Sequence, residues 1–313
     1  MESLKLSFEA ITPIFLLMAL GYCLRMWKVA DKKEFDAMNR LVFRVFLPVL
    51  LFFNIYKTDA TRMFDAKLVL FVVAGELLVF LLGYFLVFRL TADTRRGVML
   101  QAFFRSNYAI LGIPLVDYIC DGRATGLASL MVAVVVPLIN ILAVTTLERF
   151  RPDGGKPNLK KLVTGILKNP LIIGCVLGMV FFLGGFKLPL VLERSVENVS
   201  KVASPLAIIT LGASFTFSSI RGYAKDIAII LAARLIIVPL LALPLAALLG
   251  LTGEAMACLL IIYGGPVAVS SFSMAQQMGA DENLAAHAVV FTSAGCLLTL
   301  FVWIFALNML GLF

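Results

Sequence analysis

Apolar residues in this chain gather into long stretches that are separated by short polar segments. A helix needs about 20 mostly apolar residues to cross the hydrocarbon core of a bilayer. Stretches of that kind lie at about residues 7–27, 38–56, 67–89, 98–120, 125–147, 162–184, 195–217, 226–249, 255–278 and 284–309. The pattern predicts an all-α membrane protein with ten transmembrane helices.

Two of the predicted spans contain residues that interrupt a helix. Residues 98–120 include Gly112-Ile113-Pro114, and residues 255–278 include Gly264-Gly265-Pro266. Proline lacks a backbone N–H and its ring clashes with the preceding turn, so we expect helical hydrogen bonds to fail near residues 111–114 and again near Pro266. Unpaired backbone groups persist in a membrane only inside protein or beside a water-filled cavity. Two interrupted spans in corresponding halves of a chain indicate a secondary-transporter site.

The composition excludes several other classes of protein. Hydrophobic residues make up 61% of the 313 residues and charged residues 15%, whereas soluble domains carry about 25% charged residues. Basic loops on one side of a membrane explain the formal net charge of +8, so we expect no nucleic-acid partner. The five cysteines are scattered singly, and no metal-ligand spacing, Walker A or hydrolase motif occurs. We therefore expect no metal, no cofactor and no enzymatic activity.

Lysine and arginine are distributed unevenly over the predicted loops. One set of loops, at residues 25–33, 95–96, 149–161 and 221–225, holds 13 of them, whereas the alternate loops hold fewer and none lies between the eighth and ninth spans. Loops rich in Lys and Arg stay in the cytoplasm. The sequence therefore predicts a multi-pass protein of the cell's inner membrane with both termini on the non-cytoplasmic side.

An internal repeat divides the chain near its middle. Three residues recur 157 positions later, namely Pro13 as Pro170, Gly21 as Gly178 and Pro48 as Pro205. Because each half holds five spans, the second half has the opposite orientation. We expect residues 1–147 and 162–313 to form two inverted five-helix repeats joined by a cytoplasmic linker at 148–161. The interrupted fourth and ninth helices would then cross near the middle of the membrane.

The first interrupted span carries candidate substrate ligands. Asn107 lies about two helical turns before Pro114, and its amide either donates to a substrate carboxylate or holds neighbouring helices together. Arg105 either attracts an organic anion or extends to the membrane surface. A half-helix beginning near Pro114 would direct its positive end at an anion, so Gly112, Ile113 and Pro114 belong to the predicted site.

The second interruption offers a similar set of groups. Gly265 and Pro266 mark the expected break, and the half-helix after them would also present free N–H groups. The hydroxyls of Ser270 and Ser271 either bind substrate or bond to their own backbone.

Three further ionisable residues of the predicted spans are candidates for structural or coupling roles. Glu76 and Arg234 are nearly equivalent under the repeat and form either a structural ion pair or part of a proton relay. His287 is the single histidine of the chain. It either takes part in proton coupling or lies incidentally near the membrane surface.

Several motifs, taken in order, resemble the auxin efflux carrier family of membrane transporters. They are Pro13 with Gly21-Tyr22, Asn39-Arg40-Leu41 before Pro48, Asn107 with Gly112-Ile113-Pro114, Asn169-Pro170, Pro205 with Leu211-Gly212-Ala213-Ser214, Arg234 with Pro239, and Gly265-Pro266. The resemblance covers nearly the whole chain. It implies crossed helices 4 and 9 that move like an elevator past a scaffold of helices 1, 2, 6 and 7, and a homodimer formed through that scaffold. It also implies that Asn107 helps to hold the substrate carboxylate.

The short central link is similar to that of bacterial members of the family, which are described as permeases for malate, malonate or similar acids. We therefore expect a secondary transporter for a small organic anion such as a mono- or dicarboxylate, coupled to H⁺, to Na⁺ or to neither. One alternative is sodium-coupled symport, as in the bile-acid symporters that the family resembles. The other is a membrane sensor that binds such anions without transporting them.

Overall fold

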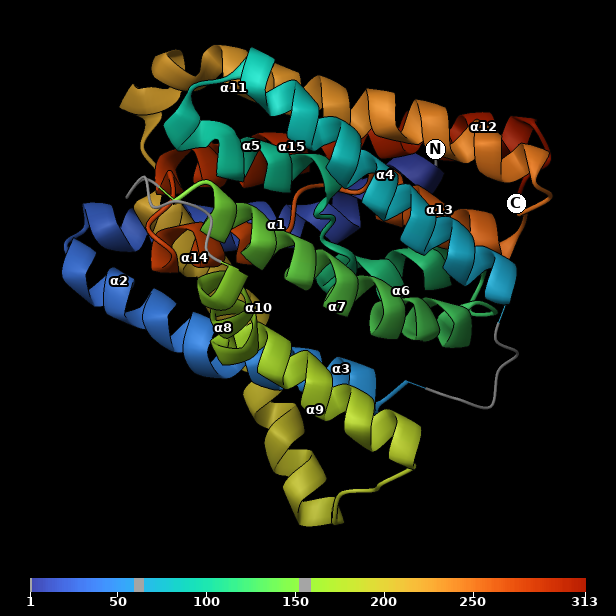
Figure 1. The fold of residues 1–313 in the computed structure, drawn as a ribbon, viewed down its shortest axis with the longest axis horizontal. Helices are drawn as coiled ribbons and strands as arrows, with labels where there is room; N and C mark the ends of the chain where they lie inside the picture. Colours follow the sequence, from blue (N-terminus) through green and yellow to red (C-terminus); the bar gives the residue numbers. More distant parts are fainter. Residues whose placement is uncertain (1, 59–64, 152–158) are drawn as a thin grey trace.

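The computed structural model describes residues 2–58, 65–151 and 159–313, and within these ranges the chain is helical without any extended strand. Figure 1 shows the arrangement of the helices. They are α1 (Glu2–Met26), α2 (Lys32–Leu41), α3 (Leu47–Tyr56), α4 (Ala66–Leu90), α5 (Arg96–Phe104), α6 (Tyr108–Ile119), α7 (Thr125–Arg149), α8 (Leu159–Lys168), α9 (Pro170–Gly184), α10 (Leu190–Ser214), α11 (Ile220–Ala232), α12 (Val238–Leu248), α13 (Glu254–Gly264), α14 (Ser270–Gln277) and α15 (Glu282–Met309). The predicted all-α fold is confirmed.

Apolar segments long enough to cross a membrane recur along the described chain. By length and composition they are Lys32–Tyr56, Ala66–Leu90, Thr125–Arg149, Phe217–Leu248 and Glu282–Met309, with shorter apolar helices at Thr12–Met26, Tyr108–Ile119, Pro170–Gly184 and Glu254–Gly264. Large apolar side chains such as Leu78 and Leu82 of α4 face outward, which suits contact with lipid tails. The fold is that of a polytopic membrane protein, while the count of ten spans stays a prediction.

The predicted sixth span is divided in the structure. α8 ends at Lys168, and α9 begins at Pro170 with Asn169 as its N-cap, whose side chain accepts a hydrogen bond from the amide of Leu171. Proline suits a first helical position because the N–H that it lacks would have no intrahelical acceptor there. The apolar helix of this region therefore begins at Pro170. Residues 152–158 of the predicted linker lie outside the described residues.

Prolines also explain two short π-helices. Val42–Phe46 joins α2 to α3 before Pro48, and Ala233–Ile237 joins α11 to α12 before Pro239. A proline cannot donate to the carbonyl four residues earlier, and its ring crowds that carbonyl. A single wider π-helical turn relieves both the missing hydrogen bond and the crowding of the carbonyl. Such π-bulges occur as single turns inside α-helices. The second of these π-helices carries the buried Arg234.

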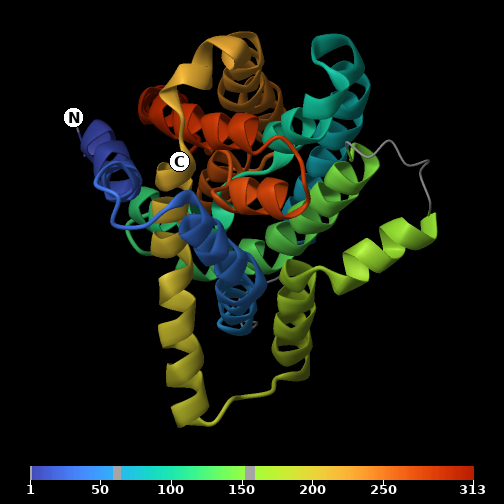
Figure 2. The same ribbon diagram turned by 90° about the vertical axis from the view of Figure 1, so that its left-hand side faces the viewer.

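Glycines allow two pairs of helices to pack with their backbones in contact. A side chain on Gly21 of α1 would meet the backbone of α10 at Ile209, and one on Gly178 of α9 would meet the backbone of α3 at Phe52. Small residues at such positions let membrane helices approach closely. Figure 2 shows α9 and the beginning of α10 extending together from the rest of the bundle.

Two spans are interrupted, and their interruptions meet inside the protein. One lies between α5 and α6, at residues 105–107, and the other between α13 and α14, at residues 265–269. The second is where the sequence predicts it. The first is not, because α6 continues through Pro114 without a break. Pro114 deprives one carbonyl of its partner, whereas the backbone at 105–107 finds new partners across the molecule, so tertiary pairing decides where this helix opens.

Candidate functional site

The two interruptions pair with each other like two very short antiparallel strands. Ser106 and Val267 form an isolated bridge. The amide of Asn107 donates to the carbonyl of Pro266 at 2.9 Å, and the amide of Ala268 donates to the carbonyl of Arg105 at 3.2 Å. These bonds satisfy backbone groups that lie too deep for bulk water, and they hold four half-helix ends around one point.

Arg234 closes one side of this crossing. Its guanidinium is 0% exposed and donates to the carbonyls of Ile262 at 2.5 Å, Gly265 at 2.9 Å, Phe103 at 3.2 Å and Phe104 at 3.4 Å. These carbonyls end α5 and α13, where a helix leaves acceptors without intrahelical donors. One side chain therefore caps the C-terminal ends of both half-helices.

Arg105 also lies at this crossing, inside the first interruption. Its side chain is only 1% exposed, so it does not extend to a membrane surface. Its Nη2 donates to Asn140 Oδ1 at 2.7 Å and to Ser270 Oγ at 3.0 Å, and its Nη1 donates to Gln101 Oε1 at 2.9 Å and to Met274 Sδ at 3.3 Å. All of these acceptors are neutral. Among the described residues, no carboxylate pairs with this buried cation.

A small cavity opens beside Arg105. Its polar lining comes from Arg105, Ser106, Asn107, Asn140 and Ser270. Three buried polar atoms here lack a hydrogen-bond partner within the described chain, namely Arg105 Nε, Ser106 Oγ and Asn107 Nδ2. Buried polar groups are almost always satisfied in folded proteins, so a cluster of three indicates a place where a ligand supplies the missing partner.

Two helix beginnings lie beside the same cavity. Asn107 is the N-cap residue of α6, but its side chain makes no capping bond, although its carbonyl accepts from the amides of Ile110 and Leu111. α14 begins at Ser270. The first amides of a helix lack intrahelical acceptors and carry a partial positive charge, so both ends favour an anion in the cavity.

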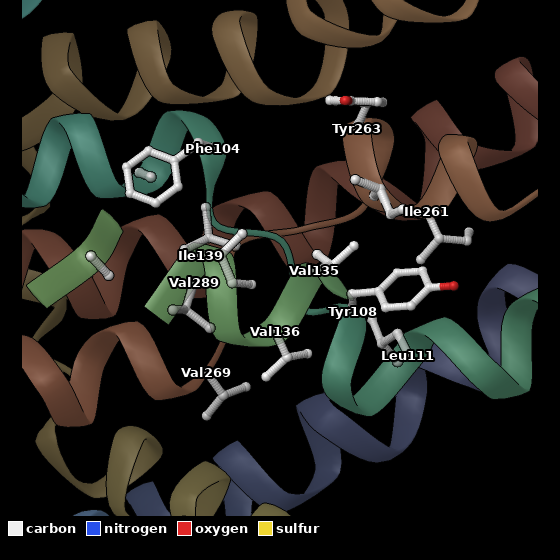
Figure 3. Close-up of a cluster of buried hydrophobic side chains, with 14 of the residues drawn as sticks. Phe104, Tyr108, Leu111, Val135, Val136, Ile139, Ile261, Tyr263, Val269 and Val289 are labelled. Atoms are coloured by element: carbon white, nitrogen blue, oxygen red, sulfur yellow. The ribbon is translucent and has the colours of Figure 1, made fainter. Parts of the chain in front are cut away.

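Apolar side chains form the rest of the wall. Leu47, Leu50 and Leu51 of α3, Ile139 of α7 and Leu171 of α9 line the cavity. Figure 3 shows further packing around the first interruption, with Phe104 before it, Tyr108 after it, and Val135 and Val136 of α7 nearby. A low-dielectric wall strengthens the attraction between Arg105 and an anion.

The structure gathers only part of the predicted site at the cavity. Arg105, Asn107 and Ser270 line it, while Gly265 and Pro266 contribute backbone carbonyls to Arg234 and Asn107. The buried Ser271 lies next to the lining residue Ser270. Gly112, Ile113 and Pro114 lie within α6 and do not line the cavity, because that helix begins at Tyr108 rather than near the proline. Their predicted positions at the break are therefore wrong.

Glu76 and Arg234 are both fully buried, as expected, but a direct ion pair does not form between them. The guanidinium is bound by backbone carbonyls, and neither carboxylate oxygen of Glu76 has a hydrogen-bond partner in the described chain. His287 is also buried, away from the crossing. Its Nε2 lies 2.9 Å from Ser219 Oγ, among the rings of Phe215 and Tyr223.

Three further polar residues in contact with Arg105 or adjacent to it are not among the predicted ligands. Gln101 and Asn140 position Arg105, and Ser106 contributes an unpartnered hydroxyl. Asn140 could have been noticed as an amide inside an apolar span, which is a signal of a buried polar contact. Its hydrogen bond to Arg105 could not have been predicted from the sequence, because this pairing depends on how the first interruption lies against α7.

Interrupted helices that meet around a buried polar cavity are typical of membrane transporters. The profile of the family described as "Membrane transport protein" matches residues 6–304. The chain therefore belongs to this family, which is the auxin efflux carrier family that its motifs resemble.

Relatives match nearly the whole chain at low identity. "Uncharacterized transporter YfdV" of Escherichia coli is 23% identical over 302 residues, which cover 94% of this chain and 96% of the relative. An "Uncharacterized transporter" of Methanothermobacter thermautotrophicus is 24% identical over 302 residues, which cover 95% of this chain and 97% of the relative. A "Putative malonate transporter" of Rhizobium meliloti is 23% identical over 297 residues, with 90% of each chain covered.

Proposed function

We propose that this protein is a secondary transporter for small organic anions, with mono- and dicarboxylates as the substrate class. The observation that carries the proposal is Arg105, a buried cation that lines the cavity without a carboxylate partner among the described residues. An unpaired buried charge is costly, and a substrate carboxylate would neutralise it. The name of the Rhizobium meliloti relative makes malonate the first substrate to test.

The substrate would bind between groups that belong to different helices. Arg105 Nε, Asn107 Nδ2 and the first amides of α6 would donate to the carboxylate, and the apolar side chains of α3 and α9 would contact the rest of the molecule. A ligand drives a conformational cycle only through different affinities for its states. A site shared between the interrupted helices and α3 and α9 meets that requirement, because its geometry changes when one set moves past the other.

The proposal includes the architecture that the family resemblance implies. Ten spans in two inverted repeats, an elevator-like movement of the crossing, and a homodimer in the inner membrane form one consistent scheme. The contacts of α1 with α10 and of α3 with α9 support it, since each joins a helix of the first half to one of the second. The paired interruptions at residues 105–107 and 265–269 support it as well.

Flux of radiolabelled malonate and malate into proteoliposomes tests this function. We expect saturable uptake that falls about tenfold in Asn107→Ala, since one hydrogen bond to a charged group contributes about 1.5 kcal/mol. The exposed Asn198 offers the matched control, and Asn198→Ala should transport like the wild type. Proton, sodium and voltage gradients are imposed separately to identify the coupling. Binding without flux would favour the sensor, and unchanged uptake in Asn107→Ala would remove this residue from the site.

A further inference from the structure

Glu76 is a buried acid that the proposed binding site does not use. It lies near the middle of α4 and is 0% exposed, and neither of its carboxylate oxygens has a hydrogen-bond partner in the described chain. A carboxylate without partners in a low-dielectric interior is strongly disfavoured relative to the neutral acid. In this conformation, Glu76 is therefore expected to hold a proton.

Arg234 is bound to α13 beside Tyr263, which contacts α4, but the charge of Arg234 is already compensated. Its donors bind the carbonyls at the ends of α5 and α13. The C-terminal end of a helix carries roughly half a negative charge, so two such ends together match one guanidinium. Glu76 consequently has no free counter-charge while both half-helices remain on Arg234.

The remaining titratable groups around Glu76 are few. Tyr263 of α13 lies against α4 and donates to the carbonyl of Val72 at 3.2 Å, close to Glu76 along that helix. Cys296 of α15 contacts the carbonyl of Gly264, next to the Gly265 carbonyl that accepts from Arg234. The helices packed on α4 carry charged residues only near their ends. These are Arg96 in α5, Glu148 and Arg149 in α7, and Glu254 in α13, while α12 carries none. Glu76 is therefore the one fully buried acid among the described residues of α4 and of the helices packed on it.

We propose that Glu76 is the proton-binding site of this transporter and that Arg234 links its protonation to the crossing of the interrupted helices. When the half-helices shift, the carbonyls leave Arg234, and the guanidinium becomes available to a carboxylate. Glu76 then gives up its proton to water and becomes the counter-charge of Arg234. The proton returns when the half-helices return. This proposal rests on the proposed transport function and makes H⁺ the coupling ion.

Two transport modes in proteoliposomes test the proposal. The first is malonate accumulation driven by an inwardly directed proton gradient, and the second is malonate–malonate exchange without a gradient. Glutamine has the shape of the protonated acid but cannot release a proton. We therefore expect Glu76→Gln to exchange malonate near the wild-type rate, while its gradient-driven accumulation falls to that of protein-free liposomes. Accumulation that persists in Glu76→Gln would overturn the proposal.

Two variants serve as comparisons. Glu254 lies in the first turn of α13 and is partly exposed, so Glu254→Gln should keep both transport modes. His287→Gln should also keep proton-driven accumulation. Loss of accumulation in His287→Gln but not in Glu76→Gln would assign the proton to the histidine instead.

Infrared spectroscopy tests the proton-binding site without transport. The wild-type protein at neutral pH should show a carbonyl band of a buried carboxylic acid that is absent from Glu76→Gln. Absence of this band from the wild type would overturn the proposal, even if Glu76→Gln does not fold. Absence of malonate exchange in the wild type, with the band present, would instead contradict the proposed transport function.

Discussion

Two buried arginines lie at the helix crossing, and their surroundings differ. Arg234 is surrounded by backbone carbonyls at the ends of two half-helices. Arg105 has neutral side-chain acceptors, an unpartnered Nε and an adjacent cavity. The first arrangement compensates the charge within the protein, whereas the second leaves it for a ligand. A buried cation can thus have a structural role or a role in ligand binding. The outcome depends on whether groups of the protein already compensate its charge.

The largest effect is expected from removing the compensated arginine. Arg234→Met leaves several buried carbonyls without donors, so we expect the free energy of unfolding to fall by about 3 kcal/mol or more. Thermal unfolding and size-exclusion chromatography of the purified protein measure this loss. The matched control is Arg44→Met, because Arg44 is an exposed arginine in the other π-helix. Equal stability of the two variants would contradict the structural role of Arg234.

The opposite result is expected for the uncompensated arginine. Arg105→Gln removes a buried charge that lacks a counter-ion, so stability should change little or increase. Malonate binding should weaken about 10- to 100-fold, since a charge-assisted hydrogen bond contributes about 1.5–3 kcal/mol. Calorimetric titration in detergent measures the affinity for malonate, and thermal unfolding of the same samples measures the stability. A variant that loses stability but retains affinity would reverse the assignment of the two arginines.

A smaller effect is expected from the residue that orients Arg105. Asn140→Ala removes the 2.7 Å acceptor of Arg105 Nη2, so malonate affinity should fall about fivefold, as for the loss of one hydrogen bond worth about 1 kcal/mol. Thr145 lies on the same helix and bonds to the carbonyl of Ile141, so Thr145→Ala is the control. An affinity equal to that of the control would show that Asn140 does not position the guanidinium.

The helical membrane fold and the second interruption are predictable from the sequence because they depend on local properties. Long apolar stretches require helices in a bilayer, and Gly265 and Pro266 disfavour a helix wherever they lie. The first interruption is not predictable in the same way, since Pro114 is a local signal that the structure tolerates. The opening at residues 105–107 has no comparable signal, because its backbone partners come from residues 266–268.

The two buried arginines likewise show what can and cannot be predicted from the sequence. Their positions within apolar spans, and hence their need for partners, follow from the order of residues alone. That Arg234 meets two helix ends and Arg105 meets a cavity follows only from how the chain folds. The fate of a buried charge depends on the field around it, and that field is made by segments far apart in the chain.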